Sequence, residues 1–191
     1  MLNEQDFILL LRQGNQQAFK QLVETWQHMV YNTVLSIVQD EQEAEDVSQE
    51  VFIQIYQSVH AFRGDAKLST WIYRVALTKA LDAERKKKAK KRIANLKTWI
   101  GIGDSEKETE AIHFQHPGVL LDKKEQAAML FKAMQKIPEN QRIAFTLIKA
   151  EGLNYEETAA IMNLTIKAVE ALMHRAKDNL KKQLQSFYTN Q

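Results

Sequence analysis

The segment 154–177 carries the residues whose types and spacing best suit binding chemistry. Small, polar and basic side chains recur there at helical spacing and would share the outward face of one helix: Thr165, Lys167, Ala168, Glu170, Ala171, His174, Arg175 and Lys177. Such a helix can insert its N-terminal part into the major groove of duplex DNA, while lysine and arginine meet phosphates. Glu170 has two interpretations: it accepts from a cytosine amino group or, as we favour, pairs with His174 or Arg175 along the helix.

A helix-turn-helix would position that face. Asn154 or Tyr155 opens a first helix, whose inner side holds Thr158, Ala159, Ile161 and Met162. Asn163 falls at the tight turn, because asparagine tolerates left-handed backbone, and Leu164 is expected to fill the core beneath it. Thr165 can cap the second helix, whose inner side would be Val169, Leu172, Met173 and Ala176. An ordinary helical hairpin has the same outline and remains the alternative.

Aromatic and basic residues also gather in the segment 62–82, a mixture that suits unstacked, single-stranded nucleic acid. Trp71 and Tyr73 could offer flat surfaces to bases, while phosphates would meet Arg63, Lys67, Arg74 and Lys79. Against this interpretation, Trp71 and Ile72 fit the helical stripe of a core.

Charge is unevenly distributed, although the net charge is only +2. The segment 40–50 carries six acids and no base, and the segment 85–92 carries seven bases in eight positions. These runs predict contacts with two different kinds of partner; the alternative is two solvated helix surfaces.

Several classes of protein are excluded by what the sequence lacks. With no cysteine there is no disulfide or thiolate metal site, and no phosphate loop, nucleophile elbow or metal-spaced cluster is present. His113 and His116 lack the further ligands of a metal pair. We therefore expect no enzyme and no cofactor. Without a signal peptide or an apolar run of membrane-spanning length, we expect a cytoplasmic protein with no membrane insertion.

Helical periodicity and few breakers, 6 Gly and 2 Pro, predict an all-α fold of two small helical domains joined by a flexible linker. Apolar stripes are expected along three helices of the first domain, and the third helix should continue into the basic run. Asp40 can cap the second of these helices, whose stripe would be Ala44, Val47, Val51, Ile55 and Val59. A second set of helices begins near Asp122, with Pro138 in the first turn of a helix that stops at Glu151-Gly152. The expected boundaries are 1–92, a linker at 93–122, and a C-terminal helix-turn-helix domain at 123–191.

At this point the sequence resembles a family. The segments Gly152–Lys177 and Ile137–Arg142 resemble the C-terminal, promoter-reading domain of sigma-70 family RNA polymerase sigma factors. The segments Asp46–Phe52 and Phe62–Asp82 resemble the N-terminal domain, and their order and spacing are similar to those of the extracytoplasmic-function (ECF) group. The resemblance implies a subunit that binds core RNA polymerase and directs promoter-specific initiation. The alternative is a stand-alone helix-turn-helix regulator, for which the two N-terminal segments would be surplus.

The resemblance also implies a role for each surface. The clamp helices of the polymerase large subunit would be bound by Asp46, Gln49, Glu50 and Phe52. The melted minus-ten strand would be read by Arg63, Gly64, Asp65, Lys67, Ser69, Tyr73, Arg74, Thr78 and Lys79. The loop from Arg63 to Ser69 would hold a flipped base, the basic run would grip duplex DNA upstream, and the C-terminal helix would read the minus-thirty-five element. An anti-sigma factor is an expected partner.

The chain departs from the family's common pattern in the promoter-reading helices. Thr78 stands where asparagine is common, Asn163 where glycine is common, and Glu170 and Leu172 where a basic residue and arginine are common. These changes predict a shifted sequence preference with binding retained through Lys167, His174 and Arg175. The promoter sequence, the inducing signal, the anti-sigma factor and the relative orientation of the domains are not encoded in any motif.

Overall fold

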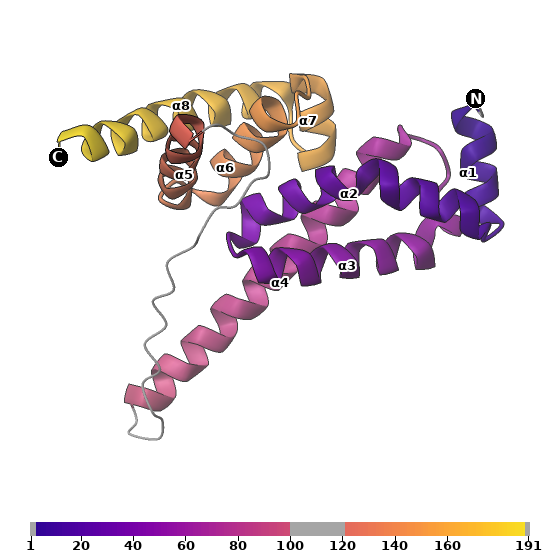
Figure 1. Ribbon diagram of the computed structural model, residues 1–191, viewed down its shortest axis with the longest axis horizontal. Coiled ribbons are helices and arrows are strands. Elements are labelled where there is room, and N and C mark those ends of the chain that lie inside the picture. The colour runs from indigo at the N-terminus through magenta and orange to yellow at the C-terminus, as the bar shows by residue number, and fades with distance from the viewer. Residues whose placement is uncertain (1–2, 100–120, 190–191) are drawn as a thin grey trace.

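The computed structural model describes residues 3–99 and 121–189, and within them the side chains of 3–93 and 127–185. Every regular element in this part of the chain is helical, as expected. An N-terminal domain holds α1 to α4 and a C-terminal domain holds α5 to α8 (Figure 1). The bounds are α1 Glu4–Arg12, α2 Gln16–Val38, α3 Glu41–Ser58, η1 Val59–Ala61, α4 Leu68–Trp99, α5 Leu121–Gln135, α6 Glu139–Phe145, η2 Thr146–Ala150, α7 Tyr155–Met162 and α8 Ile166–Thr189.

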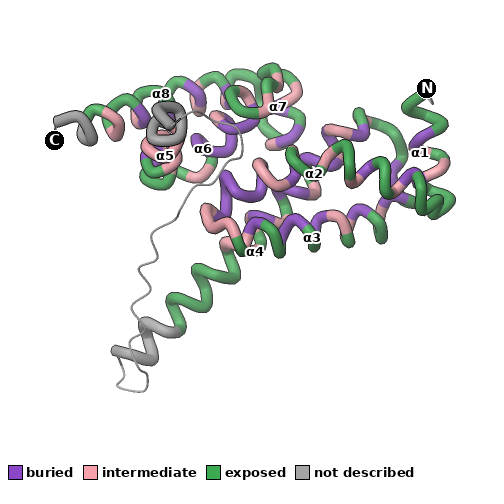
Figure 2. The backbone as a smooth tube through the Cα atoms, viewed as in Figure 1, coloured by how far each residue is buried: buried purple, intermediate pink, exposed green. Residues whose placement is uncertain are grey.

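The N-terminal domain follows its apolar stripes. Asp40 caps α3 as predicted, because its carboxylate accepts from the backbone N–H of Glu43 at 2.8 Å. The predicted stripe of α3 is buried along its whole length, as Figure 2 shows for the faces that α2, α3 and α4 turn toward one another: Ala44, Val47, Val51, Ile55 and Val59. In α4 the fully buried side chains include Leu68 and Ile72, while Trp71 is half-buried and packs on Phe62 with ring centroids 5.1 Å apart.

The C-terminal domain begins with α5, whose Ala133 packs with Ile137, Ala176 and Leu180 in a small cluster. Pro138 stands at the N-cap of α6, one residue before the predicted position. The helix that we expected to run unbroken to Glu151 changes at Thr146 into a π-helical stretch, η2, before the chain turns at Glu151 and Gly152.

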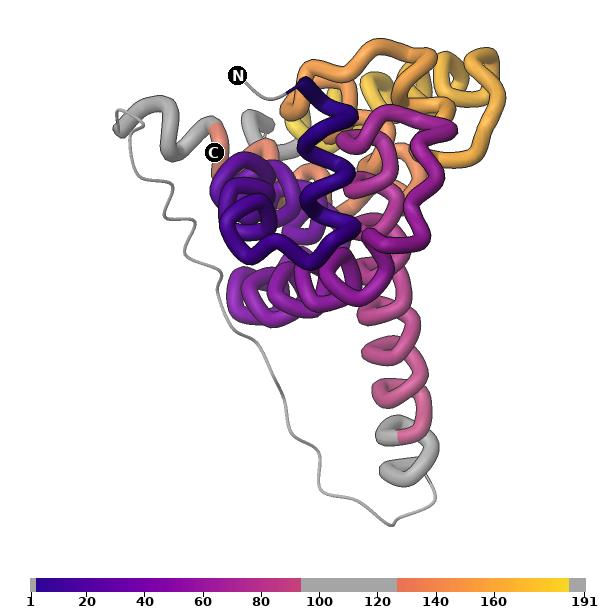
Figure 3. Tube along the Cα trace, turned by 90° about the vertical axis from the view of Figure 1, so that its right-hand side faces the viewer, coloured from indigo at the N-terminus to yellow at the C-terminus, as the bar shows by residue number. Residues whose placement is uncertain are grey.

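The two domains pack on each other, an arrangement that the sequence left open. Ile143, Leu147 and Ile161 of the C-terminal domain belong to the same buried cluster as the core of α2 to α4. Buried Arg142 crosses this seam, and its Nη2 donates to the carbonyl of Ile37 at 3.1 Å. Burial lowers the pKa of Arg142. Figures 1 and 3 show the C-terminal helices resting on the upper part of the N-terminal bundle.

One expectation about the chain's organisation needs correction. The linker was expected from residue 93, but α4 continues as a helix to Trp99, and its basic half projects beyond the bundle (Figure 1). The N-terminal residues also form a helix, α1, which the periodicity did not predict. Residues 100–120, with His113 and His116, lie outside the described residues. No helix in the described part is long and apolar enough to span a bilayer.

Candidate nucleic-acid interface

The helix-turn-helix forms through local capping. Asn154 and Glu157 make a reciprocal capping box at the start of α7: the Glu157 N–H donates to Asn154 Oδ1 at 2.8 Å and the Asn154 N–H donates to Glu157 Oε2 at 3.3 Å. Asn163 adopts the left-handed conformation that the turn requires, with φ 54° and ψ 46°. Thr165 caps α8, because its Oγ1 accepts from the Ala168 N–H at 3.2 Å. The predicted turn and cap are therefore confirmed.

The outward face of α8 carries the predicted side chains. Val169, Met173 and Ala176 are buried against the domain. The exposed candidates are Thr165, Lys167, Glu170, His174, Arg175 and Lys177, and the half-buried ones are Ala168 and Ala171. Geometrically, this face can present short and basic side chains to a DNA groove.

Two local expectations in this motif are wrong. Leu164 does not fill the core, because 40% of its surface is exposed, whereas Ile161 of α7 and Val169 of α8 are buried. His174 does not pair with Glu170, because its Nδ1 lies 3.2 Å from Asp178 on the next turn. Within the described residues Glu170 has no ion pair, so its carboxylate faces solvent on the outward side of α8.

The acidic surface lies on α3. Asp46, Gln49 and Glu50 are exposed there, and Phe52 is half-buried beside a shallow hollow of about 430 Å³ between α2 and α3. Two exposed apolar side chains continue this surface, Ile53 at 57% and Tyr56 at 53%. An acidic face with an apolar edge suits a basic helical partner.

The third candidate surface consists of α4 and the loop before it. Arg74, Thr78 and Lys79 line a hollow of about 340 Å³ together with Trp71. In the loop Gly64 has φ +86°, and Arg63 pairs with Asp65 at 3.0 Å. Ser69 is half-buried in the first turn of α4. Tyr73 is only 6% exposed, so its ring is not on the surface in this arrangement.

The C-terminal domain contacts the same residues of this surface. Both Nε and Nη2 of Arg74 donate to the carbonyl of Ala160 in the last turn of α7, at 3.0 Å and 2.7 Å. Lys67 Nζ lies 2.9 Å from Glu157 Oε1. This hydrogen bond raises the pKa of Lys67 and lowers that of Glu157. The polar groups of Lys67 and Arg74, both predicted to meet DNA, are therefore engaged by α7 in this structure.

Tyr73 lies at the centre of this contact. Its hydroxyl donates to Glu151 Oε2 at 3.3 Å. Burial, more than the neighbouring carboxylate, raises the pKa of Tyr73, and burial also raises the pKa of Glu151 against the hydrogen bonds from Asn32 and Tyr73. The sequence pattern of α4 predicted an exposed Tyr73, because that pattern contains no information on the contact with the C-terminal domain.

The basic run is partly neutralised within the protein. Lys87 Nζ lies 2.5 Å from Glu43 of α3, and Lys88 contacts Glu84 at 3.2 Å and Glu139 of α6 at 3.1 Å. The remaining bases of the run, Arg85, Lys86, Lys90, Lys91 and Arg92, are exposed along the projecting part of α4 (Figure 2). Within the described residues no cluster of His, Asp and Glu is placed to hold a metal ion.

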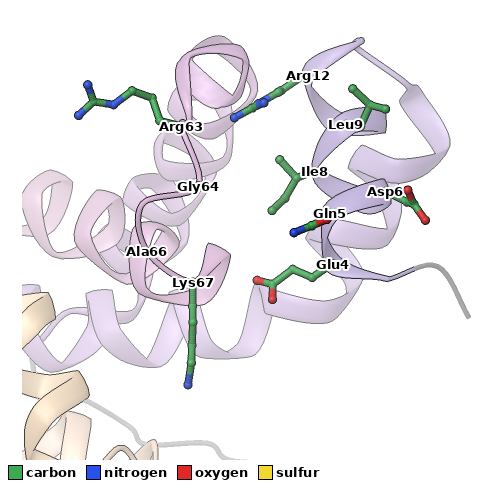
Figure 4. A pocket seen from close by; sticks show the side chains of 10 residues that line it. All are labelled: Glu4, Gln5, Asp6, Ile8, Leu9, Arg12, Arg63, Gly64, Ala66 and Lys67. Atoms are coloured by element: carbon green, nitrogen blue, oxygen red, sulfur yellow. The ribbon is translucent and has the colours of Figure 1, made fainter.

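Sequence patterns did not predict the contribution of α1. Glu4 and Arg12 reach the loop before α4 across 64 and 50 residues of chain, so no local pattern connects them. Between α1 and the loop lies an open hollow of about 650 Å³ (Figure 4).

Comparison with protein families matches two separate segments. Residues 22–90 match the family described as Sigma-70 region 2, and residues 127–180 match Sigma-70, region 4. The first segment includes α3, the loop and the first part of α4, and the second includes the helix-turn-helix. The matched segments therefore contain all three candidate surfaces.

Relatives and solved structures match over nearly the whole chain. The RNA polymerase sigma-H factor of Pseudomonas aeruginosa is 32% identical over 95% of this chain and 94% of its own length. The ECF RNA polymerase sigma-E factor of Escherichia coli K12 is 31% identical over 96% and 95%. The structure of CnrH in complex with the cytosolic domain of CnrY has TM-score 0.69 at 22% identity, covering 96% and 97%. The Bartonella quintana sigma factor RpoE, solved with the anti-sigma factor NepR, has TM-score 0.65 at 24%, covering 87% and 96%.

Proposed function

Because the chain belongs to the sigma-70 family of RNA polymerase sigma factors, in its ECF group, we propose that its three surfaces divide the work of promoter-specific initiation. The chain is a sigma factor: it binds core RNA polymerase and directs it to promoters. It acts in the cytoplasm, where its DNA target lies, and an anti-sigma factor holds it inactive. It contributes no bond-making chemistry of its own.

The α3 surface binds the polymerase. Asp46, Gln49 and Glu50 offer acceptors to the basic clamp helices of the large subunit, while Phe52 and the exposed Ile53 supply apolar area. Charge complementarity would steer the encounter, and the apolar edge would lengthen the lifetime of the complex. This surface distinguishes a sigma factor from a stand-alone regulator, which has no use for it.

The α4 surface holds the melted strand. Its hollow brings Arg74, Thr78 and Lys79 together with the edge of Trp71, a combination that suits phosphates and an unstacked base. The preceding loop, with exposed Arg63 and Lys67, supplies the pocket for a flipped base. The exposed bases further along α4 grip duplex DNA upstream.

The α8 surface reads the upstream duplex element. Lys167, Arg175 and Lys177 meet phosphates or guanine edges, and Glu170, free of an ion pair within the described residues, is available to a cytosine amino group. The observation that carries the proposal is the joint exposure of the acidic α3 face and this capped recognition helix on one chain.

The proposal is tested by transcription with purified core polymerase and a promoter library. Wild-type protein should direct discrete start sites. The charge-reversed Asp46→Lys/Glu50→Lys variant should not, although its α8 surface still binds duplex DNA. Start sites that do not depend on the added chain would refute the function, and duplex binding with no start site on any promoter would favour the stand-alone regulator.

A further inference from the structure

The loop of residues 63–67 is fastened at both ends by one helix from the far N-terminus. At its start, Arg12 Nη2 donates to the carbonyl of Phe62. At its end, the backbone N–H of Leu68 donates to Glu4 Oε1 at 3.1 Å. Figure 4 shows both side chains extending from α1 toward the loop, and Figure 3 shows α1 lying across the front of the domain.

Glu4 acts as the N-cap of α4. Leu68 is the first residue of that helix, so its N–H has no acceptor within the helix. The preceding residue is Lys67, whose side chain has no acceptor to offer. The carboxylate of Glu4 supplies the missing acceptor from another helix, and its negative charge is favourable beside a helix N-terminus.

Arg12 holds the start of the loop at Phe62. Phe62 is buried and its ring packs on Trp71, so the carbonyl that Arg12 holds belongs to a well-packed residue. Between the two anchors the loop is exposed and bends at Gly64, whose φ of +86° is a conformation that other residues rarely adopt. The loop therefore has fixed ends and an accessible centre.

We propose that Glu4 and Arg12 are positioning residues that set the conformation in which the 63–67 loop meets the melted promoter strand. The inference rests on the proposed function of that loop. Neither residue needs to touch the DNA, because each acts through a backbone group of the loop. A misplacement of about 1 Å in a contacting group is enough to weaken recognition strongly, so the clamp would sharpen discrimination between bases.

The clamp itself is tested without DNA, in the full chain, by hydrogen exchange and limited trypsin digestion. Glu4→Ala should speed exchange of the Leu68 amide by roughly 2- to 30-fold, the range of a lost N-cap, and Glu4→Gln should restore most of the protection. Glu4→Ala and Arg12→Ala should both speed tryptic cleavage after Arg63 and Lys67. Asp6→Ala is the matched control, because Asp6 lines the same hollow and has no bond to the loop. Unchanged exchange and cleavage in both variants would overturn the clamp.

The role in promoter reading is tested with holoenzyme assembled from core polymerase and each full-length variant. The probe is a promoter library randomised in the melted segment and in the upstream element. Glu4→Ala should lower discrimination in the melted segment by roughly tenfold, about the value of one base contact, and leave discrimination upstream unchanged. Equal loss in both elements, or no loss, would overturn the inference. If wild-type holoenzyme starts no transcript, the proposed function fails and base selection fails with it, while the exchange experiment still decides the clamp.

Discussion

Replacing Arg74 by alanine should loosen the contact between α4 and α7. The guanidinium of Arg74 donates to the carbonyl of Ala160. This carbonyl lies in the last turn of α7 and receives no hydrogen bond from an N–H of that helix. A hydrogen bond from a charged donor contributes about 1.5–3 kcal/mol when protected from water. Because Arg74 is exposed, solvent screening reduces this to about 1–2 kcal/mol, or roughly a 5- to 30-fold shift toward separated helices.

The assay exploits the absence of cysteine from the chain. Cysteines introduced at the exposed positions Gln57 and Lys181 carry a donor and an acceptor dye, and energy transfer reports the separation of the two domains. Arg74→Ala should lower the population with high transfer. Arg85→Ala is the matched control, because Arg85 is an exposed arginine of α4 whose one ion pair among the described residues is with Asp82 on its own helix. Equal transfer for wild type and Arg74→Ala, or equal loss for Arg85→Ala, would refute the reasoning.

Three further outcomes are expected. Reversing Asp46 and Glu50 to lysine should abolish the complex with core polymerase in a pull-down, whereas Gln57→Lys on the same helix should not; full retention of the complex would contradict the α3 assignment. Arg175→Ala should weaken upstream-element binding by about 1–3 kcal/mol for one sequence if it meets a base; if it meets phosphate, the loss should be uniform and the salt slope smaller. Glu151 has a raised pKa through burial, so its stabilising contribution is complete below the unfolded value near 4.5 and is lost as pH rises through the folded pKa. The urea midpoint of Glu151→Gln should therefore not fall with rising pH in the way that the wild-type midpoint does. If the midpoints of the variant and the wild type run parallel across the pH range, the assignment to Glu151 is wrong.

The parts of the fold that were predictable from sequence depend on local interactions. The buried stripe of α3, the Asp40 cap and the left-handed Asn163 each follow from residues within one or two helical turns. The pairing of His174 was not predictable, because Glu170 and Asp178 are both four residues away and exposed pairs differ little in free energy. A local sequence pattern therefore identifies the helix, but it does not determine which of two equivalent ion pairs forms on its surface.

The parts that were not predictable depend on contacts across long stretches of chain. Tyr73 has the sequence context of a surface aromatic, but Glu151 and the C-terminal domain cover it. Glu4 and Arg12 lie in a segment with no distinctive motif, and their role exists only where α1 meets the loop. The outward positions of α8 were identified correctly because amphipathic periodicity fixes them; whether they bind DNA is a property that periodicity does not determine.

The seam between the domains has different contacts at its two ends, and this difference decides which end should open first. At the α4–α7 end, beside buried Tyr73 and Ile161, the polar contacts are one exposed ion pair, Lys67–Glu157, and the hydrogen bonds from exposed Arg74. Phosphates carry the same sign of charge as Glu157 and could replace these contacts. At the α2–α6 end it buries Ile143 and Leu147, and burial of one such side chain contributes about 1.5–3 kcal/mol. Separation there would also remove the carbonyl of Ile37 from Arg142.

Opening should therefore begin between α4 and α7, with α6 leaving α2 later. In hydrogen exchange on the full chain, a single-stranded oligonucleotide should expose the C-terminal turn of α7 while the amides of α6 stay protected. Simultaneous loss of protection in both helices would mean that the domains separate as a unit. In that case the buried contacts of Arg142 would control access to Lys67 and Arg74 as strongly as the exposed contacts do.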